Sequence, residues 1–178
     1  MNKNKILNIS NSLSFLRLVL TIPVCWFLLN DNNVGFIVLV LIAMLTDFLD
    51  GYFARKRDEI TEFGKIIDPL ADKVIIGAVA VVMLFKGLIP LWFLVAVLSR
   101  DVLILLGGLY LSKKLGYVIY SDFIGKLSVN ILALIMILII FKIEFFINYG
   151  LYIALAALLA SFANYLVRMI IMLKDGKK

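Results

Sequence analysis

Six long apolar runs, joined by short polar connections, constrain this chain more than any other feature. A run of about 20 apolar residues is long enough to cross a bilayer as a helix. The composition fits this interpretation, because 63% of the 178 residues are hydrophobic and an ordinary soluble domain is roughly 45–50% apolar. The sequence therefore predicts an all-α fold, a polytopic bundle of six transmembrane helices that forms one membrane domain over residues 1–178. We expect the helices over about residues 11–29, 34–54, 63–85, 91–111, 121–141 and 146–173.

The basic residues between the runs predict the orientation. Lysine and arginine gather in cytoplasmic loops. One side of the predicted bundle has only Lys86 and Lys142. The other side, which we predict to be cytoplasmic and to include both termini, carries Lys3, Lys5, Arg55, Lys56, Arg57, Lys113, Lys114, Lys174, Lys177 and Lys178. The net charge of +6 is thus explained by topology and attraction to anionic headgroups, and nucleic-acid binding is disfavoured. We expect an integral protein of a bacterial inner or cell membrane.

Histidine is absent, and Cys25, inside the first apolar run, is the only cysteine. The chain therefore lacks the commonest general base and the commonest zinc ligand, and no disulfide can form within it. A metal bound here must be held by oxygen atoms, which favours Mg²⁺ or Mn²⁺.

Four aspartates lie within predicted spans, where ionisable residues are costly and usually functional. Asp47 and Asp50 are three residues apart and share one helix face, and Asp68 and Asp72, four apart, share another. Carboxylates that converge in a low dielectric repel strongly unless a cation neutralises them. The two pairs flank the loop 56–61, so we expect a metal site that opens to the cytosolic interface.

The same residues form a longer pattern, Asp47-x₂-Asp50-Gly51-x₂-Ala54-Arg55-x₈-Gly64-x₃-Asp68-x₃-Asp72. This pattern resembles the complete signature of the CDP-alcohol phosphatidyltransferases, with all eight specified residues in place. The segment Asn11-Ser-Leu-Ser-Phe-Leu-Arg17 is similar to the family's usual opening, Asn-x-Leu-Thr/Ser-x-x-Arg. The motif covers residues 47–72, and the six-helix layout extends the likeness over the chain.

The resemblance implies metal-dependent transfer of a phosphatidyl group from CDP-diacylglycerol to an alcohol, with release of CMP, in phospholipid biosynthesis. It implies one or two Mg²⁺ or Mn²⁺ ions as cofactors and a homodimer with one site per subunit. The implied roles are metal binding for Asp47, Asp50, Asp68 and Asp72, with Asp72 also the catalytic base for the acceptor hydroxyl. Gly51, Ala54 and Gly64 would let the nucleotide approach the helices, and Arg55 would pair with the diphosphate.

The acceptor alcohol stays open between two branches of the superfamily. Arg100 and Lys126 are the candidate acceptor-binding residues, since both are expected near cytosolic helix ends. Enzymes that make phosphatidylglycerol phosphate from glycerol 3-phosphate usually have further basic residues where this chain has Gly108 and Ser128. Their absence favours phosphatidylglycerol as acceptor, as in cardiolipin synthases, whereas the size and composition of the chain favour the enzymes that use glycerol 3-phosphate, so the two acceptors are nearly equal alternatives. Glycerol 3-phosphate use should then be weak unless another cation, such as Arg17 or Lys113, fills the gap.

The alternative from another class is a cation transporter or channel whose intramembrane aspartates line an ion path. It explains carboxylates within spans. It does not explain the spacings of Gly51, Ala54, Arg55 and Gly64. Release of CMP from CDP-diacylglycerol distinguishes the two functions.

Overall fold

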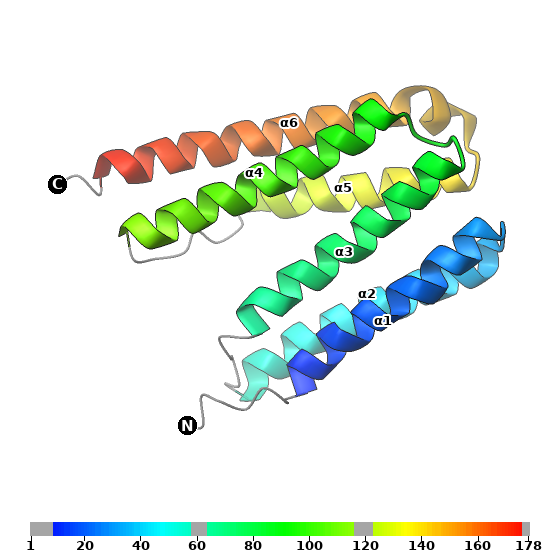
Figure 1. The fold of residues 1–178 in the computed structure, drawn as a ribbon, viewed down its shortest axis with the longest axis horizontal. Coiled ribbons are helices and arrows are strands. Elements are labelled where there is room, and N and C mark those ends of the chain that lie inside the picture. Colours follow the sequence, from blue (N-terminus) through cyan, green and yellow to red (C-terminus); the bar gives the residue numbers. More distant parts are fainter. Residues whose placement is uncertain (1–8, 58–63, 116–122, 176–178) are drawn as a thin grey trace. The chain divides into compact units, whose positions relative to one another are not determined.

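The structure is a computed structural model that describes the backbone over residues 9–57, 64–115 and 123–175. Side chains are described for residues 12–46, 71, 73–108, 110–111 and 123–174. The described backbone is helical throughout apart from short turns, which confirms the predicted all-α class and all six helices (Figure 1). The helices are α1 (Ile9–Leu29), α2 (Asn33–Arg57), α3 (Gly64–Phe85), α4 (Leu91–Leu115), α5 (Phe123–Ile140) and α6 (Glu144–Asp175).

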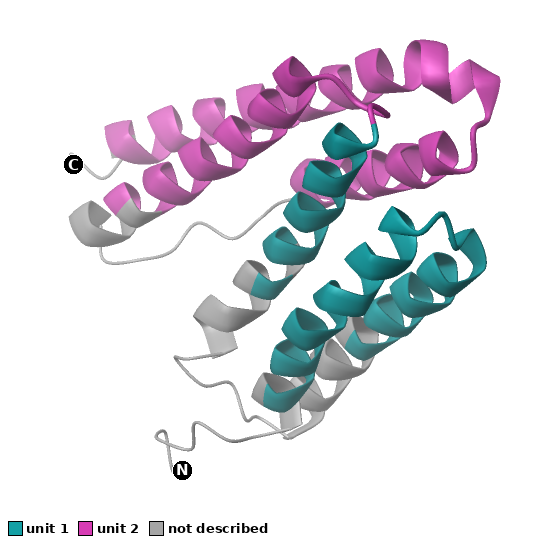
Figure 2. Cartoon of the chain, turned by 45° about the vertical axis from the view of Figure 1, so that its right-hand side comes forward, with its two compact units in different colours: residues 1–86 teal, residues 87–178 magenta. Residues whose placement is uncertain are grey.

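Two compact units divide the chain, residues 1–86 with α1–α3 and residues 87–178 with α4–α6 (Figure 2). The prediction of one domain over residues 1–178 stays a prediction. Each unit is a helix hairpin with a third helix packed on it. In the first, α1 packs against both α2 and α3, and in the second, α6 packs against both α5 and α4.

The turn between α1 and α2 is fixed by backbone hydrogen bonds. Asp31 has a positive φ of 56°, the Asp31 N–H donates to the Leu28 carbonyl and the Asn32 N–H donates to the Phe27 carbonyl. This pair of bonds is a Schellman motif, which satisfies carbonyls at the end of α1. The Asn32 side chain then accepts a bond of 2.9 Å from the Gly35 N–H and so caps the start of α2. The chain reverses within three residues, and α2 runs back along α1.

Lys86 ties the end of α3 to the same turn. Its ammonium group donates to the Leu28 carbonyl at 2.9 Å and pairs with the Asp31 carboxylate at 2.7 Å. A cation at this place also interacts favourably with the negative end of the α1 dipole. The end of α3 therefore lies level with the end of α1, and the start of α3 lies at the end of the unit where α2 finishes (Figure 1).

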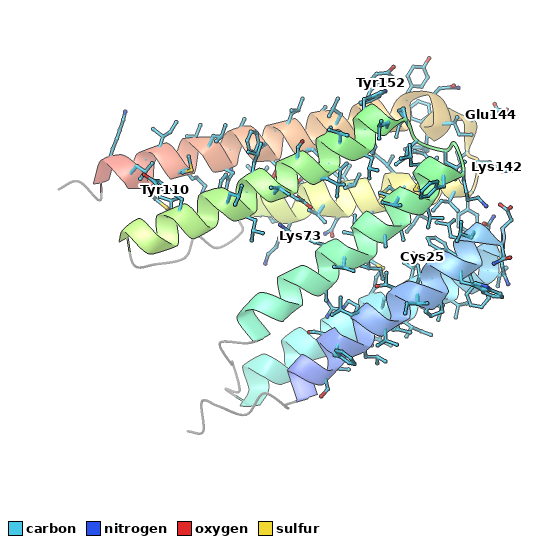
Figure 3. The ribbon with its side chains drawn as sticks, in the orientation of Figure 1. Cys25, Lys73, Tyr110, Lys142, Glu144 and Tyr152 are labelled. Atoms are coloured by element: carbon cyan, nitrogen blue, oxygen red, sulfur yellow. The ribbon has the colours of Figure 1, made fainter. Side chains whose placement is uncertain are left out.

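In the second unit α4 and α6 run parallel and are joined by two side-chain hydrogen bonds. Arg100 donates to the Ser161 hydroxyl at 2.6 Å, and the Tyr165 hydroxyl donates to the Ile104 carbonyl at 3.1 Å. The two bonds are one helical turn apart and keep the same register. α5 and α6 form an antiparallel hairpin whose turn contains Lys142, with φ of 57°, beside Glu144 at the start of α6 (Figure 3).

The outer faces of the helices are apolar. Within the described residues, the parts of α1, α4, α5 and α6 are long and apolar enough to cross a membrane, and α2 and α3 contribute shorter apolar stretches at 33–46 and 73–85. Many large apolar side chains are exposed, Ile22, Val34 and Phe123 among them. Such exposure suits lipid rather than water. The chain is a polytopic helical membrane protein.

Candidate active site

The eight motif positions lie on the two helices that the sequence assigns to them. Residues 47–55 belong to the last turns of α2, and residues 64–72 to the first turns of α3. The two segments are therefore at the same end of the first unit, separated along the chain by residues 56–63 (Figure 1). The side chains of the motif lie outside the described residues, so their predicted roles stay predictions. These are Asp47, Asp50, Gly51, Ala54, Arg55, Gly64, Asp68 and Asp72.

The described part of each helix indicates which face the aspartate positions continue. On α2 the buried residues Phe36, Ala43 and Thr46 form a stripe at helical spacing. Positions 47 and 50 follow Ala43 by one and two turns, so they extend this stripe toward the end of α2. On α3 the fully buried Ala71 lies one turn after position 68 and beside position 72. This register is compatible with the predicted convergence of the two aspartate pairs, whose side chains lie outside the described residues.

α1 supplies a polar stripe to the same interior. Ser14, Arg17 and Thr21 are buried, and Val24 and Leu28 continue the stripe with apolar side chains. Only 2% of Arg17 is exposed. The two threonines of the interior use their hydroxyls within their own helices, Thr21 to the Arg17 carbonyl and Thr46 to the Ala43 carbonyl. Because Arg17 is enclosed, it does not extend to the interface in the way that long basic side chains at helix ends often do.

The donor set fits a hard divalent cation. Four carboxylates at two helix ends supply oxygen atoms only, the ligand type that Mg²⁺ and Mn²⁺ prefer. Cys25, the single cysteine, lies on α1 toward the opposite end of the unit. Among the side chains that the structure describes, no group of three or more His, Cys, Asp or Glu is present, so the four aspartates remain the candidate ligands.

The predicted acceptor residue Arg100 is part of a partly buried network. Its guanidinium pairs with Asp101 at 2.8 Å and donates to Ser161 on α6, while its Nε atom is buried without a hydrogen-bond partner in the described structure. A partly buried guanidinium that joins two helices helps to fix their register. The sequence alone does not reveal Ser161 as the partner of Arg100, because they are far apart along the chain.

Lys126, the other predicted acceptor residue, is exposed on the first turns of α5. A Cβ atom added to Gly150 would lie 2.9 Å from Ile135, which sets the register of the α5–α6 hairpin. Because α5 and α6 are antiparallel, counting from that contact places Lys126 within about one helical turn of the level of Ser161 along the bundle. Arg100 is hydrogen-bonded to Ser161, so Lys126 and Arg100 are at a similar level. The structure brings these two predicted residues to a similar height within the second unit.

Ser128 and Gly108 are the two positions where a further basic residue is expected for glycerol 3-phosphate, and both are filled by contacts within the protein. Ser128 is 3% exposed, and its hydroxyl donates to the Gly125 carbonyl at 2.8 Å. At Gly108, an added Cβ would meet the Tyr165 hydroxyl at 3.7 Å. Arg168 follows Tyr165 by one turn on α6. The α4–α6 register that the Tyr165–Ile104 bond sets places Arg168 level with Gly107 and Gly108.

Comparison with known proteins agrees with the motif. The family model for CDP-alcohol phosphatidyltransferase matches residues 7–172. Three similar proteins carry the name CDP-diacylglycerol–glycerol-3-phosphate 3-phosphatidyltransferase. The protein of Aquifex aeolicus is 42% identical over 111 residues, 61% of this chain and 62% of the relative. That of Bacillus subtilis is 36% identical over 91 residues, 51% and 47% of the two chains. That of Mycoplasma genitalium is 31% identical over 138 residues, 66% and 58%.

These matches span 47–62% of the length of the three relatives. The family model, by contrast, extends from α1 into α6 and includes the whole aspartate motif. It thereby covers both compact units of the fold. The chain belongs to the CDP-alcohol phosphatidyltransferase family.

Proposed function

We propose that this protein transfers the phosphatidyl group of CDP-diacylglycerol to glycerol 3-phosphate and releases CMP. The observation that carries the proposal is the unbroken eight-residue motif at the adjoining ends of α2 and α3, within a chain that the family model matches from residue 7 to 172. The three relatives described above are named for glycerol 3-phosphate, which favours that acceptor over phosphatidylglycerol.

In the proposed site Asp47, Asp50, Asp68 and Asp72 hold one or two divalent cations, Mg²⁺ or Mn²⁺. Such a cation neutralises phosphate oxygens and stabilises the charge of the departing CMP. Asp72 accepts the proton of the acceptor hydroxyl, which a carboxylate within hydrogen-bond reach can do. The oxygen of that hydroxyl attacks the phosphorus of the diacylglycerol phosphate, and the bond to the CMP oxygen breaks.

Small residues on the two helices admit the nucleotide. Gly51 and Ala54 on α2 and Gly64 on α3 present little side-chain volume, so a bulky ligand can approach the backbone. Arg55 pairs with the diphosphate, for which a guanidinium is well suited. The acyl chains of the donor stay in the lipid, because the outer faces of the described helices are apolar.

The acceptor carries a phosphate group, which cationic side chains bind. Arg100 and Lys126 are the proposed acceptor-binding residues, and the pairing of Arg100 with Asp101 reduces the charge it can offer. We place Arg168 beside them, because its level on α6 matches Gly108, where an arginine is expected for this acceptor. Each charge-assisted hydrogen bond contributes about 1.5–3 kcal/mol, so a third cation would offset one missing basic residue.

Both termini and the loop after α2 are proposed to face the cytosol, where both CDP-diacylglycerol headgroups and glycerol 3-phosphate are accessible. The distribution of lysine and arginine supports this orientation. A homodimer with one site per subunit is proposed from the family resemblance.

The test is an acceptor panel with the purified protein in mixed micelles. Labelled CDP-diacylglycerol is supplied with glycerol 3-phosphate or phosphatidylglycerol at equal concentration, and products are separated by chromatography. Saturable formation of phosphatidylglycerol phosphate supports the proposal. Cardiolipin as the main product would show that the acceptor is phosphatidylglycerol and not glycerol 3-phosphate. No CMP release with any alcohol would favour the ion-path alternative.

The proposed role of Arg168 has its own test. Arg168→Gln should raise the KM for glycerol 3-phosphate by about tenfold or more while leaving the KM for CDP-diacylglycerol unchanged.

A further inference from the structure

Arg17 is the largest side chain among the fully buried ones in the described structure. A buried charge requires a partner of opposite sign, because the desolvation of an unpaired ion is very costly. Arg17 does make a polar interaction. Among the side chains that the structure describes in the first unit, Asp31 is the sole carboxylate, and it is held by Lys86 at the opposite end of the unit.

The height of Arg17 in the unit follows from two contacts. The ion pair between Asp31 and Lys86 fixes one level that is common to α1 and α3. Counted back along each helix from this pair, Arg17 and position 72 are the same number of residues away. Since α1 and α3 run parallel, Arg17 and position 72 are at nearly the same height. On α2, the Phe27 ring lies against Gly35, where an added Cβ would be 2.7 Å away. That register places Arg17 level with Leu45, just before Asp47.

The direction of the side chain adds to this alignment. Side chains on a helix lean toward its N-terminus. From Arg17 that direction leads toward the end of the unit where α2 finishes and α3 begins, which carries the aspartate positions (Figure 1). Arg17 is also on the inward stripe of α1, with Ser14 and Thr21. Arg17 is therefore enclosed at the level where α2 carries residues 45–47 and α3 carries residue 72.

We propose that Arg17 is a positioning residue that acts as a built-in counter-charge for the aspartate cluster. Its guanidinium pairs with one or more of the four carboxylates and holds them in place before a divalent cation arrives. Its enclosure, with 2% exposed, argues against direct contact with substrate. The inference rests on the proposed metal site and adds a cation that belongs to the protein.

The proposal predicts that Arg17 and the metal ion compete for the same negative charge. Without metal, Arg17→Met leaves carboxylates uncompensated and should lower the Tm by on the order of 10 °C. With saturating Mg²⁺ the loss should be less than half as large, since the metal neutralises the same groups. By reciprocity, Mg²⁺ should raise the Tm of the variant more than that of the natural protein.

The experiment measures Tm in detergent, in EDTA and in Mg²⁺, for Arg17→Met and two matched controls. Thr21→Val removes a polar group from the same buried stripe without changing charge. Lys86→Met removes a cation from the other end of the unit. The Tm losses of both controls should be the same with and without Mg²⁺. An Arg17→Met loss that is equally insensitive to Mg²⁺, with the natural protein stabilised by the metal, would overturn the proposal.

Double-mutant cycles make the test independent of metal and of catalysis. Arg17→Lys and Arg17→Met are each combined with Asp→Asn at positions 47, 50, 68 and 72 in EDTA. At least one combination should be less destabilised than the sum of its single changes, because the removed carboxylate is the one left unpaired. If Arg17→Met alone fails to insert, the matching double variant should recover folded protein, and Arg17→Lys keeps the cycle measurable. Additivity in all four backgrounds would overturn the proposal. Absence of any Mg²⁺ effect on the natural protein, together with a positive cycle, would reject the metal site and retain the Arg17 pairing.

Discussion

Two adjacent glycines on α4 should respond oppositely to the same substitution. A Cβ atom at Gly107 would lie 2.8 Å from the Tyr165 hydroxyl and 3.2 Å from its Cε1 atom, whereas at Gly108 the nearest atom is the same hydroxyl at 3.7 Å. The first distance requires Tyr165 to move, and the second is an ordinary contact. Tyr165 is held by its bond to the Ile104 carbonyl, so it cannot move without weakening the α4–α6 contact.

The magnitudes follow from these distances. Overpacking costs about 1–3 kcal/mol, and alanine regains about 0.5–1 kcal/mol over glycine within a helix. We expect Gly107→Ala to destabilise the protein by about 1 kcal/mol, and Gly108→Ala to be neutral or stabilising by about 0.5 kcal/mol. Tyr165→Phe removes the clashing oxygen, so it should recover most of the loss caused by Gly107→Ala.

The assay is unfolding of the purified protein in detergent, followed by intrinsic fluorescence, for the two alanine variants and for Gly107→Ala combined with Tyr165→Phe. A difference of 1 kcal/mol corresponds to a Tm shift of about 2–4 °C for a chain of this size. Equal effects at the two positions, or a double variant no more stable than Gly107→Ala, would refute the packing argument.

Three further predictions concern the site and its orientation. Asp68→Asn should abolish phosphatidyl transfer while the protein stays folded and inserted, since it removes one charge from the metal ligands; CMP release close to normal would contradict the ligand assignment. EDTA should abolish activity, and Mg²⁺ or Mn²⁺ should restore it without zinc, whereas activity after thorough chelation would exclude metal dependence. In a background without Cys25, a cysteine at position 86 should be labelled from outside intact cells and one at position 56 should not; the reverse pattern would invert the proposed topology.

The helices could be predicted from the sequence because lipid leaves one solution to a long apolar run. The predicted ends differ from the observed ones mainly where charged residues extend a helix beyond its apolar part, as at Arg57 and Leu115. The turns were less accessible to prediction. Asp31 and Lys142 both adopt positive φ, a conformation that glycine adopts far more readily.

In the candidate site, too, some features could be predicted from the sequence and others could not. The aspartate positions follow from spacing along single helices, which sequence periodicity reveals. Pairings between helices do not, because they depend on register and rotation. The bond from Arg100 to Ser161 and the enclosure of Arg17 both depend on how helices pack together. Each observation changes the role that the sequence predicts for that basic residue.

The central claim is that the aspartate motif carries out phosphatidyl transfer to glycerol 3-phosphate. The most direct test supplies the purified protein with CDP-diacylglycerol, Mg²⁺ and labelled glycerol 3-phosphate, and counts CMP released against labelled lipid formed. We predict one CMP for each phosphatidylglycerol phosphate, at a rate that saturates with both substrates. CMP release without labelled lipid, or no release at all from folded protein, would contradict the claim.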